Sequence, residues 1–260
     1  MDVLTPRNLE EALRLKAECP DAAPIQGGTD VMVELNFDRA RPVALLNLNE
    51  VAELRGWSRQ NGTVWLGSGL TYAEAMEPSL AEALPALAEA ARTVGGPQIR
   101  NRGTIGGNLG TASPAGDALP PLLVCGAEVQ IGSIHGERIV PLSEFLVGPK
   151  RNVLAEDELI LGVSVDATES RQTFMKVGPR NAMVIAVVSL AVRVDSELRA
   201  AFGSAGPVAT LVRADLGDAD SFAQRVAEAA SPIDDVRGTA LYRRHALRIL
   251  TRRALDRCLV

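Results

Sequence analysis

Residues 95–117 read GGPQIRNRGTIGGNLGTASPAGD. This stretch contains seven glycines and two prolines, a density that disfavours a continuous helix and favours tightly turned backbone. Because glycine has no Cβ, such a backbone can pass close to an anion and let several N–H groups converge on it. Residues 104–113 add asparagine, threonine and serine side chains, which suit phosphate or sugar oxygens. The stretch therefore predicts a phosphate-binding loop.

A second glycine loop lies upstream, at residues 27–30 (GGTD). It follows a short extended segment at 23–26 and precedes a predicted helix that begins at Val31 and reaches Phe37. N–H groups at a helix start attract negative charge, to which the helix dipole adds about 0.3 to 2 kcal/mol. A lone glycine pair is more often a structural turn. Two separated loops of this kind fit a ligand with two linked phosphates, and a dinucleotide is the natural candidate.

Two common nucleotide-binding motifs are missing from these loops. Neither loop has the GxGxxG spacing of the usual dinucleotide-binding turn, and the sequence GxxxxGK[ST] does not occur. The usual Rossmann fingerprint and the P-loop are therefore excluded.

The rest of the chain predicts alternating helices and strands. Capping boxes at residues 71–74 and 79–82 mark two helix starts, and the second helix is expected to run to about Thr93. Further helices are expected at 8–18, 117–125, 221–230 and 239–258, and strands at 43–48, 63–67 and 127–131, with a hairpin turn at 135–137. Four more strands, at 159–165, 172–177, 184–194 and 198–203, are predicted to form one mainly antiparallel sheet.

A new unit is predicted to begin near Glu156. This boundary divides the chain into residues 1–155 and residues 156–260. The first part is divided again into subdomains at about 1–56 and 57–155.

Composition restricts the classes of function. The formal net charge of −5 argues against nucleic-acid binding, which needs a basic surface. No apolar run reaches the roughly 18 to 20 residues that span a bilayer, and the longest, 183–192, is predicted to be a buried strand. The N-terminus lacks the basic and apolar regions of a signal peptide, so a cytoplasmic location is expected.

Metal-binding residues are sparse. The cysteines Cys19, Cys125 and Cys258 are far apart in the sequence, and neither His135 nor His245 has ligand-spaced Cys, Asp or Glu around it. We therefore expect no metal site and no iron–sulfur cluster on this chain.

The stretch 95–109, continued by residues 111–114 and Asp117, resembles the FAD-binding subunit of the molybdenum hydroxylases, the xanthine dehydrogenase and carbon monoxide dehydrogenase family. Residues 24–30 (PIQGGTD) resemble the first flavin-binding loop of that family. The resemblance continues through 157–160 and 175–180, so it covers essentially the whole chain. It implies an α+β fold of the vanillyl-alcohol-oxidase or PCMH type. Two subdomains would clasp an extended FAD, and a C-terminal α+β domain of the carbon monoxide dehydrogenase flavoprotein type would cover part of the flavin.

The resemblance also implies which residues contact FAD. The first loop would line the pyrophosphate and adenosine side with Ile25, Gln26, Gly27, Gly28, Thr29, Asp30 and Val31. The second would contact pyrophosphate, ribityl or ribose groups with Thr104, Ile105, Gly106, Gly107, Asn108, Thr111, Ser113 and Asp117. Ile160 and Lys176 would lie close to the adenine or flavin portions. No catalytic residue is expected, and FAD is expected to be noncovalent because neither histidine lies in a flavin loop.

Several of these positions also suit an ordinary structural role. Asp30 fits the first turn of any helix, and on the residues alone that is the more common role. Asp117 fits a helix cap as well as a bidentate contact with a ribose diol. Lys176 fits an exposed strand lysine as well as a cation that favours anionic reduced flavin.

Several arginines also suit either a structural or a functional role. Gln98, Arg100 and Arg102 are polar residues that lead into the second loop, and the arginines could pair with phosphate or with the acidic surface of a partner subunit. The last predicted helix presents either a solvated basic face or a docking surface. Its arginines are Arg243, Arg244, Arg248, Arg252, Arg253 and Arg257.

The function that the resemblance implies is electron transfer. Electrons would leave a molybdenum cofactor on a large subunit, cross [2Fe-2S] clusters on a small subunit, and reach FAD on this chain, from which an external acceptor takes them. One alternative is a self-sufficient flavin oxidase or dehydrogenase, which the lack of a histidine or tyrosine acid–base cluster argues against. A second is a non-catalytic nucleotide-binding protein. The sequence identifies neither the substrate of the assembled enzyme nor the external electron acceptor.

Overall fold

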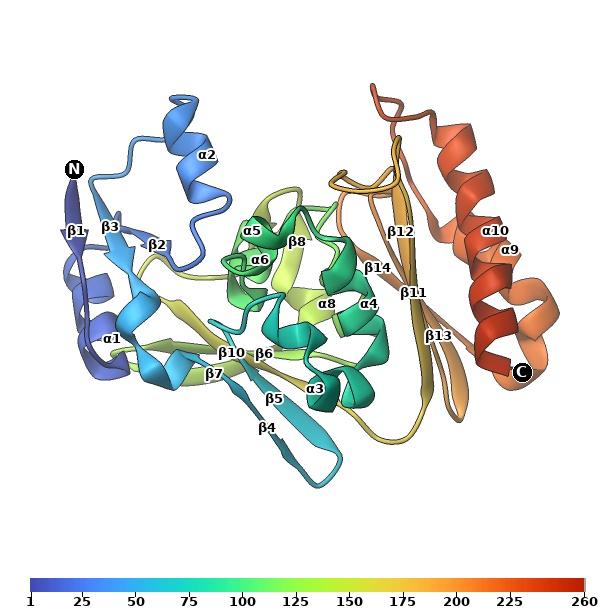
Figure 1. Cartoon of the computed structure of the whole chain (residues 1–260), viewed down its shortest axis with the longest axis horizontal. Coiled ribbons are helices and arrows are strands. Elements are labelled where there is room, and N and C mark those ends of the chain that lie inside the picture. Colours follow the sequence, from blue (N-terminus) through green and yellow to red (C-terminus); the bar gives the residue numbers. More distant parts are fainter. Residues whose placement is uncertain (260) are drawn as a thin grey trace.

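The computed structural model describes residues 1–259, and Val260, the last residue of the predicted C-terminal unit, lies outside the described residues. Three main β-sheets follow one another across the molecule, with helices packed between and beside them (Figure 1). This mixture of helices and strands confirms the predicted α+β class.

The first unit is built on a three-stranded parallel sheet in the order β1-β3-β2. Its elements are β1 (Asp2–Leu4), α1 (Leu9–Glu18), β2 (Ala23–Ile25), α2 (Val31–Asn36) and β3 (Ala44–Asn47), followed by 3₁₀ turns at Leu48–Glu50 and Ala52–Leu54. Helix α1 begins as its sequence predicts, because Asn8 Oδ1 accepts a 2.8 Å hydrogen bond from the Glu11 N–H. Helix α2, in contrast, has no buried residue.

The second unit is built on a five-stranded antiparallel sheet in the order β4-β5-β10-β6-β7. Its strands are β4 (Trp57–Gln60), β5 (Thr63–Gly67), β6 (Glu128–Ser133), β7 (Gly136–Pro141) and β10 (Leu159–Asp166), with the short pair β8 (Leu146–Gly148) and β9 (Arg151–Asn152) beside them. Its helical segments are a 3₁₀ turn at Glu74–Met76, α3 (Pro78–Ala83), α4 (Pro85–Thr93), α5 (Pro97–Arg100), α6 (Ile105–Thr111), α7 (Leu119–Val124) and α8 (Leu142–Phe145). Apolar side chains of the helices and the sheet form one core.

The helix predicted from residue 79 to Thr93 is interrupted. It forms two helices, α3 and α4, which meet at Leu84 and Pro85. Proline has no N–H to donate to the preceding turn, so a new helix starts there.

The glycine-rich stretch is more helical than its composition predicts. Thr104 caps α6 by accepting a 3.0 Å hydrogen bond from the Gly107 N–H. Ile105 and Leu109 lie four residues apart on one face of α6 and are fully buried. Packing of these two side chains therefore stabilises a helix that its three glycines disfavour.

The third unit is a four-stranded antiparallel sheet in the order β11-β12-β13-β14. Its elements are β11 (Arg171–Val177), β12 (Val188–Val194), β13 (Glu197–Gly203), β14 (Thr210–Asp215), a 3₁₀ turn at Leu216–Asp218, α9 (Ala219–Ala229) and α10 (Ala240–Leu259). Helices α4 and α7 pack on one face and α9 and α10 on the other (Figure 1). All seven residues of β12 are buried, because the sheet is covered on both faces. The predicted buried strand is confirmed only from Val188 onward, because residues 183–187 are not in a strand and Met183 and Ile185 are exposed.

The strand predicted at 159–165 belongs to a different sheet from the one expected. It was grouped with the C-terminal strands, and that grouping is wrong, because β10 lies between β5 and β6. Its register on β6 shifts between Ile160 and Gly162, at the point where Ser68 N–H donates to Leu161 O. We therefore propose that the third unit begins after β10, at residues 167–170, rather than near Glu156.

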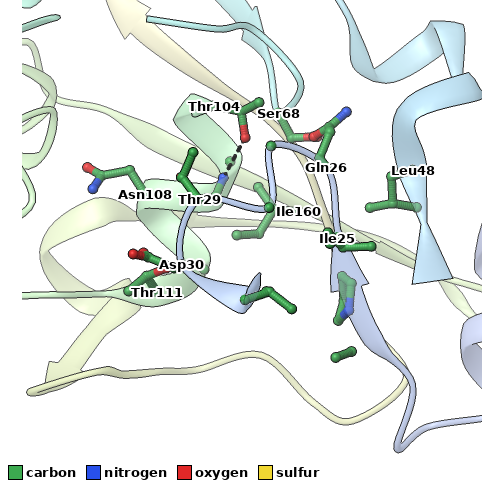
Figure 2. Close-up of a pocket in the computed structure, with 18 of the residues that line it drawn as sticks. Ile25, Gln26, Thr29, Asp30, Leu48, Ser68, Thr104, Asn108, Thr111 and Ile160 are labelled. Carbon is green, nitrogen blue, oxygen red and sulfur yellow. Dashed lines mark hydrogen bonds between the residues drawn. The ribbon is translucent and has the colours of Figure 1, made fainter. Parts of the chain in front are cut away.

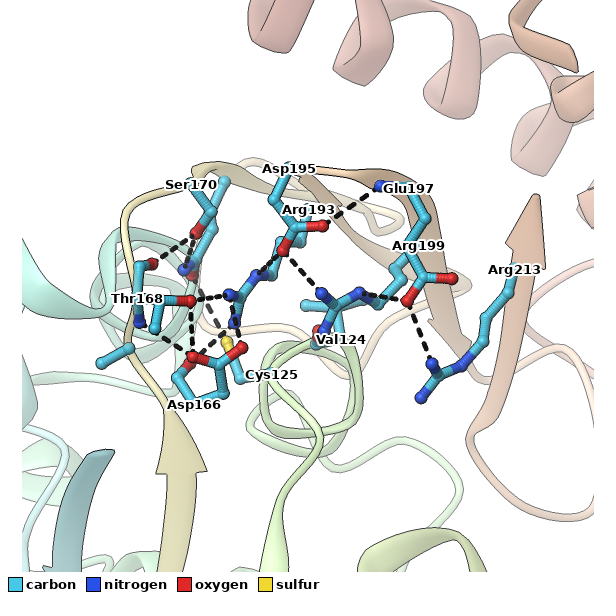
Figure 3. Close-up of polar contacts among 12 residues, drawn as sticks. Val124, Cys125, Asp166, Thr168, Ser170, Arg193, Asp195, Glu197, Arg199 and Arg213 are labelled. Atoms are coloured by element: carbon cyan, nitrogen blue, oxygen red, sulfur yellow. Dashed lines mark hydrogen bonds and ion pairs between the residues drawn. The ribbon is translucent and has the colours of Figure 1, made fainter. Parts of the chain in front are cut away.

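A buried arginine joins the second and third units (Figure 3). Arg193 of β12 is fully buried and donates to Asp195 Oδ2 at 2.9 Å and to Asp166 Oδ2 at 2.7 Å. It also donates to the Asp166 carbonyl, and Arg199 donates to the Val124 carbonyl. These bonds cross from the third sheet to β10 and α7, so the two units are held in one arrangement.

Candidate functional site

A cavity of about 840 Å³ lies between the first and second units, with both glycine loops in its wall (Figure 2). Small-molecule sites commonly measure roughly 300 to 1,000 Å³, so the space suits a cofactor. The β2–α2 loop and α2 form one wall, and α6 and β10 contribute to the others. The predicted site residues that line the cavity are Ile25, Gln26, Gly27, Gly28, Thr29, Asp30, Val31, Thr104, Gly106, Gly107, Asn108, Thr111 and Ile160.

The first loop offers free backbone donors. Within residues 1–259, the N–H groups of residues 27–31 donate no hydrogen bond to another group of the chain. Gly28 has φ of +72°, a left-handed conformation that glycine adopts without strain. Successive free N–H groups in a cavity wall suit an anion such as a diphosphate. Because α2 has only six residues, these N–H groups rather than a helix dipole provide the attraction.

The second loop differs from what its sequence predicts. Its N–H groups were expected to converge on phosphate, but the N–H groups of Ile105 and Gly106 donate to the carbonyls of Leu70 and Ser68, both at 2.8 Å. The Gly107 and Asn108 N–H groups are also used within the chain, on Thr104. This wall therefore offers a ligand its glycine surface and its side chains rather than backbone donors.

Three buried polar atoms in the cavity wall have no partner among the described residues: Gln26 Nε2, Ser68 Oγ and Asn108 Oδ1. A buried polar group without a hydrogen bond costs about 1 to 3 kcal/mol. A ligand with both donors and acceptors would remove that cost. Gln26 reaches its position because residue 69 is a glycine, whose missing Cβ would lie 2.3 Å from Gln26 Nε2.

Hydrogen bonds tie the two loops together. Thr111 Oγ1 donates to Asp30 Oδ2 at 2.8 Å, so Asp30 is more than an acidic first-turn residue. Arg102 Nη2 donates to the Gln26 carbonyl at 3.2 Å. Arg100 donates to the carbonyls of Val94 and Gly95. Arg100 and Arg102 thus make backbone contacts within the chain.

Four predicted site residues do not line the cavity. Ile105 is buried in the core beneath α6, and Ser113 Oγ accepts from the Ala115 N–H in the turn after α6. Asp117 and Lys176 form a buried ion pair, with Oδ2 and Nζ 2.5 Å apart. Their contact with FAD stays a prediction.

The charge of Asp117 acts on Tyr72, a residue of the cavity wall. Burial raises the pKa of the Asp117 carboxyl, and the Lys176 ammonium opposes that shift. Tyr72 lines the cavity, and its pKa is raised by burial and further by the charges of Asp117 and Asp30. Asp117 Oδ1 has no hydrogen-bond partner among the described residues, so one acceptor of the pair is unused.

The sequence did not identify several residues of the cavity wall. Apolar side chains that suit a ring system come from distant segments, and Glu34 and Lys150 add a pair of opposite charges. Apart from Leu159, which lies in the 157–160 segment of the resemblance, none of them belongs to a motif, so no local signal marked them. The additional apolar residues are Leu35, Pro42, Leu48, Leu154 and Leu159.

Neither histidine lines the cavity, and His135 is exposed in the β6–β7 turn. Among the described residues, no group of three His, Cys, Asp or Glu side chains is arranged to hold a metal ion. On α10, Arg243 is not part of a solvated face, because it is buried and bonded to Asp235 and the Ser204 carbonyl.

Comparison with known proteins gives these features a context. Residues 1–166 match the family described as the FAD binding domain in molybdopterin dehydrogenase. The chain belongs to this family. The match includes both glycine loops and ends at the last residue of β10.

Two relatives match different shares of the chain. The xanthine dehydrogenase FAD-binding subunit of Escherichia coli O157:H7 is 30% identical over 269 residues, which cover 95% of this chain and 92% of that one. The carbon monoxide dehydrogenase medium chain of Hydrogenophaga pseudoflava is 31% identical over 164 residues, covering 62% and 57%.

The family's fold extends through the third unit. A solved structure of carbon monoxide dehydrogenase from Hydrogenophaga pseudoflava has a TM-score of 0.91 and 25% identity, and the superposition covers 100% of this chain and 97% of that one. This agreement confirms the predicted flavoprotein fold, including its C-terminal α+β part. Among the described residues, no helix combines the length and the apolar character required to cross a bilayer.

Proposed function

We propose that this chain is the FAD-carrying electron-transfer subunit of a molybdenum hydroxylase. The observation that carries the proposal is the cavity wall at residues 27–31, where consecutive N–H groups have no partner within residues 1–259. Membership of the FAD-binding family supplies the identity of the cofactor. The cysteines of the chain are all free, and two of the three are buried.

The residues present fit FAD. The free N–H groups of the first loop would hold the diphosphate. Gln26, Ser68 and Asn108 would gain partners from the ribityl and ribose hydroxyls. Apolar side chains such as Ile25, Leu48 and Ile160 would contact ring faces and exclude water. When bound, FAD supplies the redox chemistry, while the protein positions it and sets its electrostatic environment.

The partners follow from what the relatives are named. They include a xanthine dehydrogenase FAD-binding subunit, a nicotinate dehydrogenase FAD-subunit and a nicotine 6-hydroxylase medium subunit, names that describe parts of larger enzymes. By analogy, we propose a small subunit with [2Fe-2S] clusters as electron donor, a large subunit with the molybdenum cofactor, and an external acceptor.

Reconstitution tests the proposal. The purified chain should bind FAD stoichiometrically, and dithionite should bleach its visible spectrum, which an artificial acceptor should restore. Purines or aldehydes should leave the spectrum unchanged until the other subunits are added. Direct reduction of the isolated chain by such a substrate at catalytic rates would instead support a self-sufficient oxidase.

A further inference from the structure

Helix α2 is the least anchored part of the cavity wall. None of its residues is buried, and Met32 and Val33 on it expose 43% and 44% of their surface. Figure 1 shows α2 projecting from the first sheet on long connections. An element with so few packed side chains opens at low free energy. Val31 and Leu35 of α2 are only half-buried, so the polar contacts of α2 with the opposite wall contribute much of what holds it closed.

The opposite wall is firmly held. Lys150 lies in the turn between β8 and β9, where its N–H donates to the Ala112 carbonyl at 3.1 Å. Asn152 Nδ2 donates to the Gly110 carbonyl at 2.9 Å, so the turn is fastened to the end of α6 at two points. Lys150 has φ of +55°, a conformation that glycine or asparagine adopts more easily than lysine.

An ion pair connects these two walls. Lys150 Nζ lies 2.9 Å from Glu34 Oε1 on α2, and both residues line the cavity. The hydrogen bond from Lys150 is the main cause that lowers the pKa of Glu34, which therefore stays ionised at neutral pH. Together with the Asp30–Thr111 hydrogen bond, the pair links the first turn of α2 and the residue before it to the opposite wall.

We propose that Glu34 and Lys150 form a clasp that holds α2 closed over the cavity and sets the rate at which the cofactor leaves. This inference rests on the proposed FAD site and adds two residues to it. Opening α2 would break the clasp and expose the free N–H groups of residues 27–31 to water. Closing α2 would shield them.

The expected effect is moderate, because the pair is partly exposed. The Lys150 side chain is 63% exposed and that of Glu34 is 31% exposed. Exposed ion pairs of this kind change an equilibrium by roughly two- to fivefold, and salt screens them. The clasp therefore acts on the release rate rather than providing most of the affinity.

Charge reversal tests the clasp directly. In the cofactor-free chain, Lys150→Glu and Glu34→Lys should each speed hydrogen–deuterium exchange of amides 32–39 by roughly two- to fivefold. The same variants loaded with FAD should release it faster by a similar factor, measured by the recovery of flavin fluorescence. The double variant E34K/K150E restores opposite charges and should return both rates to near wild type. Arg14→Glu, which disrupts an exposed ion pair with Glu18 outside the cavity lining, should change neither rate.

Two results would overturn the clasp. Unchanged exchange of amides 32–39 in both single variants would show that the pair does not hold α2. Release from the double variant as fast as from K150E alone would show that Lys150 acts on the cofactor and not through Glu34. The exchange measurement needs no cofactor, so it separates failure of the clasp from failure of the wild-type chain to bind FAD.

Discussion

The hydroxyl of Thr111 donates a 2.8 Å hydrogen bond to the Asp30 carboxylate, which joins two loops that are 81 residues apart in the sequence. One partner ends α6 and the other precedes α2, so this bond helps to set the width of the cavity between them.

Thr111→Val should widen this gap and weaken FAD binding about fivefold, the effect of losing roughly 1 kcal/mol from one hydrogen bond. Titration of the apoprotein with FAD would measure the change in Kd. Thr111→Ser, which keeps the hydroxyl, is the matched control. Equal losses in both variants would indicate that packing rather than the hydrogen bond is responsible.

Gly107→Val should lower the affinity for FAD by roughly tenfold or more while the chain stays folded, because the added side chain occupies the cavity. A Cβ at Gly107 would meet only Thr104 Oγ1, at 3.0 Å. At Gly106 a Cβ would lie 2.6 Å from the Ser68 carbonyl oxygen, so Gly106→Val should instead reduce thermal stability. Circular dichroism and FAD titration of both variants separate the two effects. Unchanged FAD affinity in Gly107→Val would contradict the proposed site.

Arg193→Met should lower the free energy of unfolding by about 3 kcal/mol, because it removes a fully buried guanidinium that bonds Asp195, the Asp166 carboxylate and the Asp166 carbonyl. Urea denaturation of the cofactor-free chain would measure this change in the free energy of unfolding. The control is Arg213→Met, since Arg213 is 54% exposed and pairs with Glu197. The Arg213→Met variant should lose less than about 1 kcal/mol of unfolding free energy. A similar loss in both variants would mean that burial of Arg193 contributes nothing.

Low pH should weaken the hold on α10 that the ion pair between Asp235 and Arg243 provides, because protonation of the Asp235 carboxyl removes its charge. Hydrogen bonds from Arg237, followed by those from Arg243, hold the pKa of Asp235 well below its ordinary value near 3.9. A lowered folded-state pKa stabilises the protein above the unfolded-state pKa, and this contribution is lost as the pH falls below about 4.

The melting temperature of the cofactor-free chain should therefore exceed that of Asp235→Asn at pH 6, and the difference should shrink toward pH 3. Asp220→Asn, which removes an exposed charge from α9, is the control and should run parallel to the wild type. A constant difference between wild type and Asp235→Asn across this range would rule out the proposed contribution.

Local patterns predicted much of the fold because they depend on neighbours in the sequence. The cap at Asn8 and the buried strand within 184–194 each follow from side-chain type and spacing over a few residues. The assignment of β10 to the wrong sheet has a different cause. A strand's own residues do not specify its partners when several apolar strands are available, so pairing with β5 and β6 is a long-range choice.

By itself, the sequence determined that two glycine-rich segments, at 27–30 and 104–113, can approach a phosphate-bearing ligand, since the absence of a Cβ is a property of the residue alone. Only the tertiary structure decided which segment has free donors. The N–H groups of Ile105 and Gly106 donate to the carbonyls of Leu70 and Ser68, which lie more than thirty positions away in the sequence. Those of residues 27–31 donate to no group in the described part of the chain. Hydrogen bonding is saturable, so a donor's availability depends on everything that packs against it and not on its own residue type.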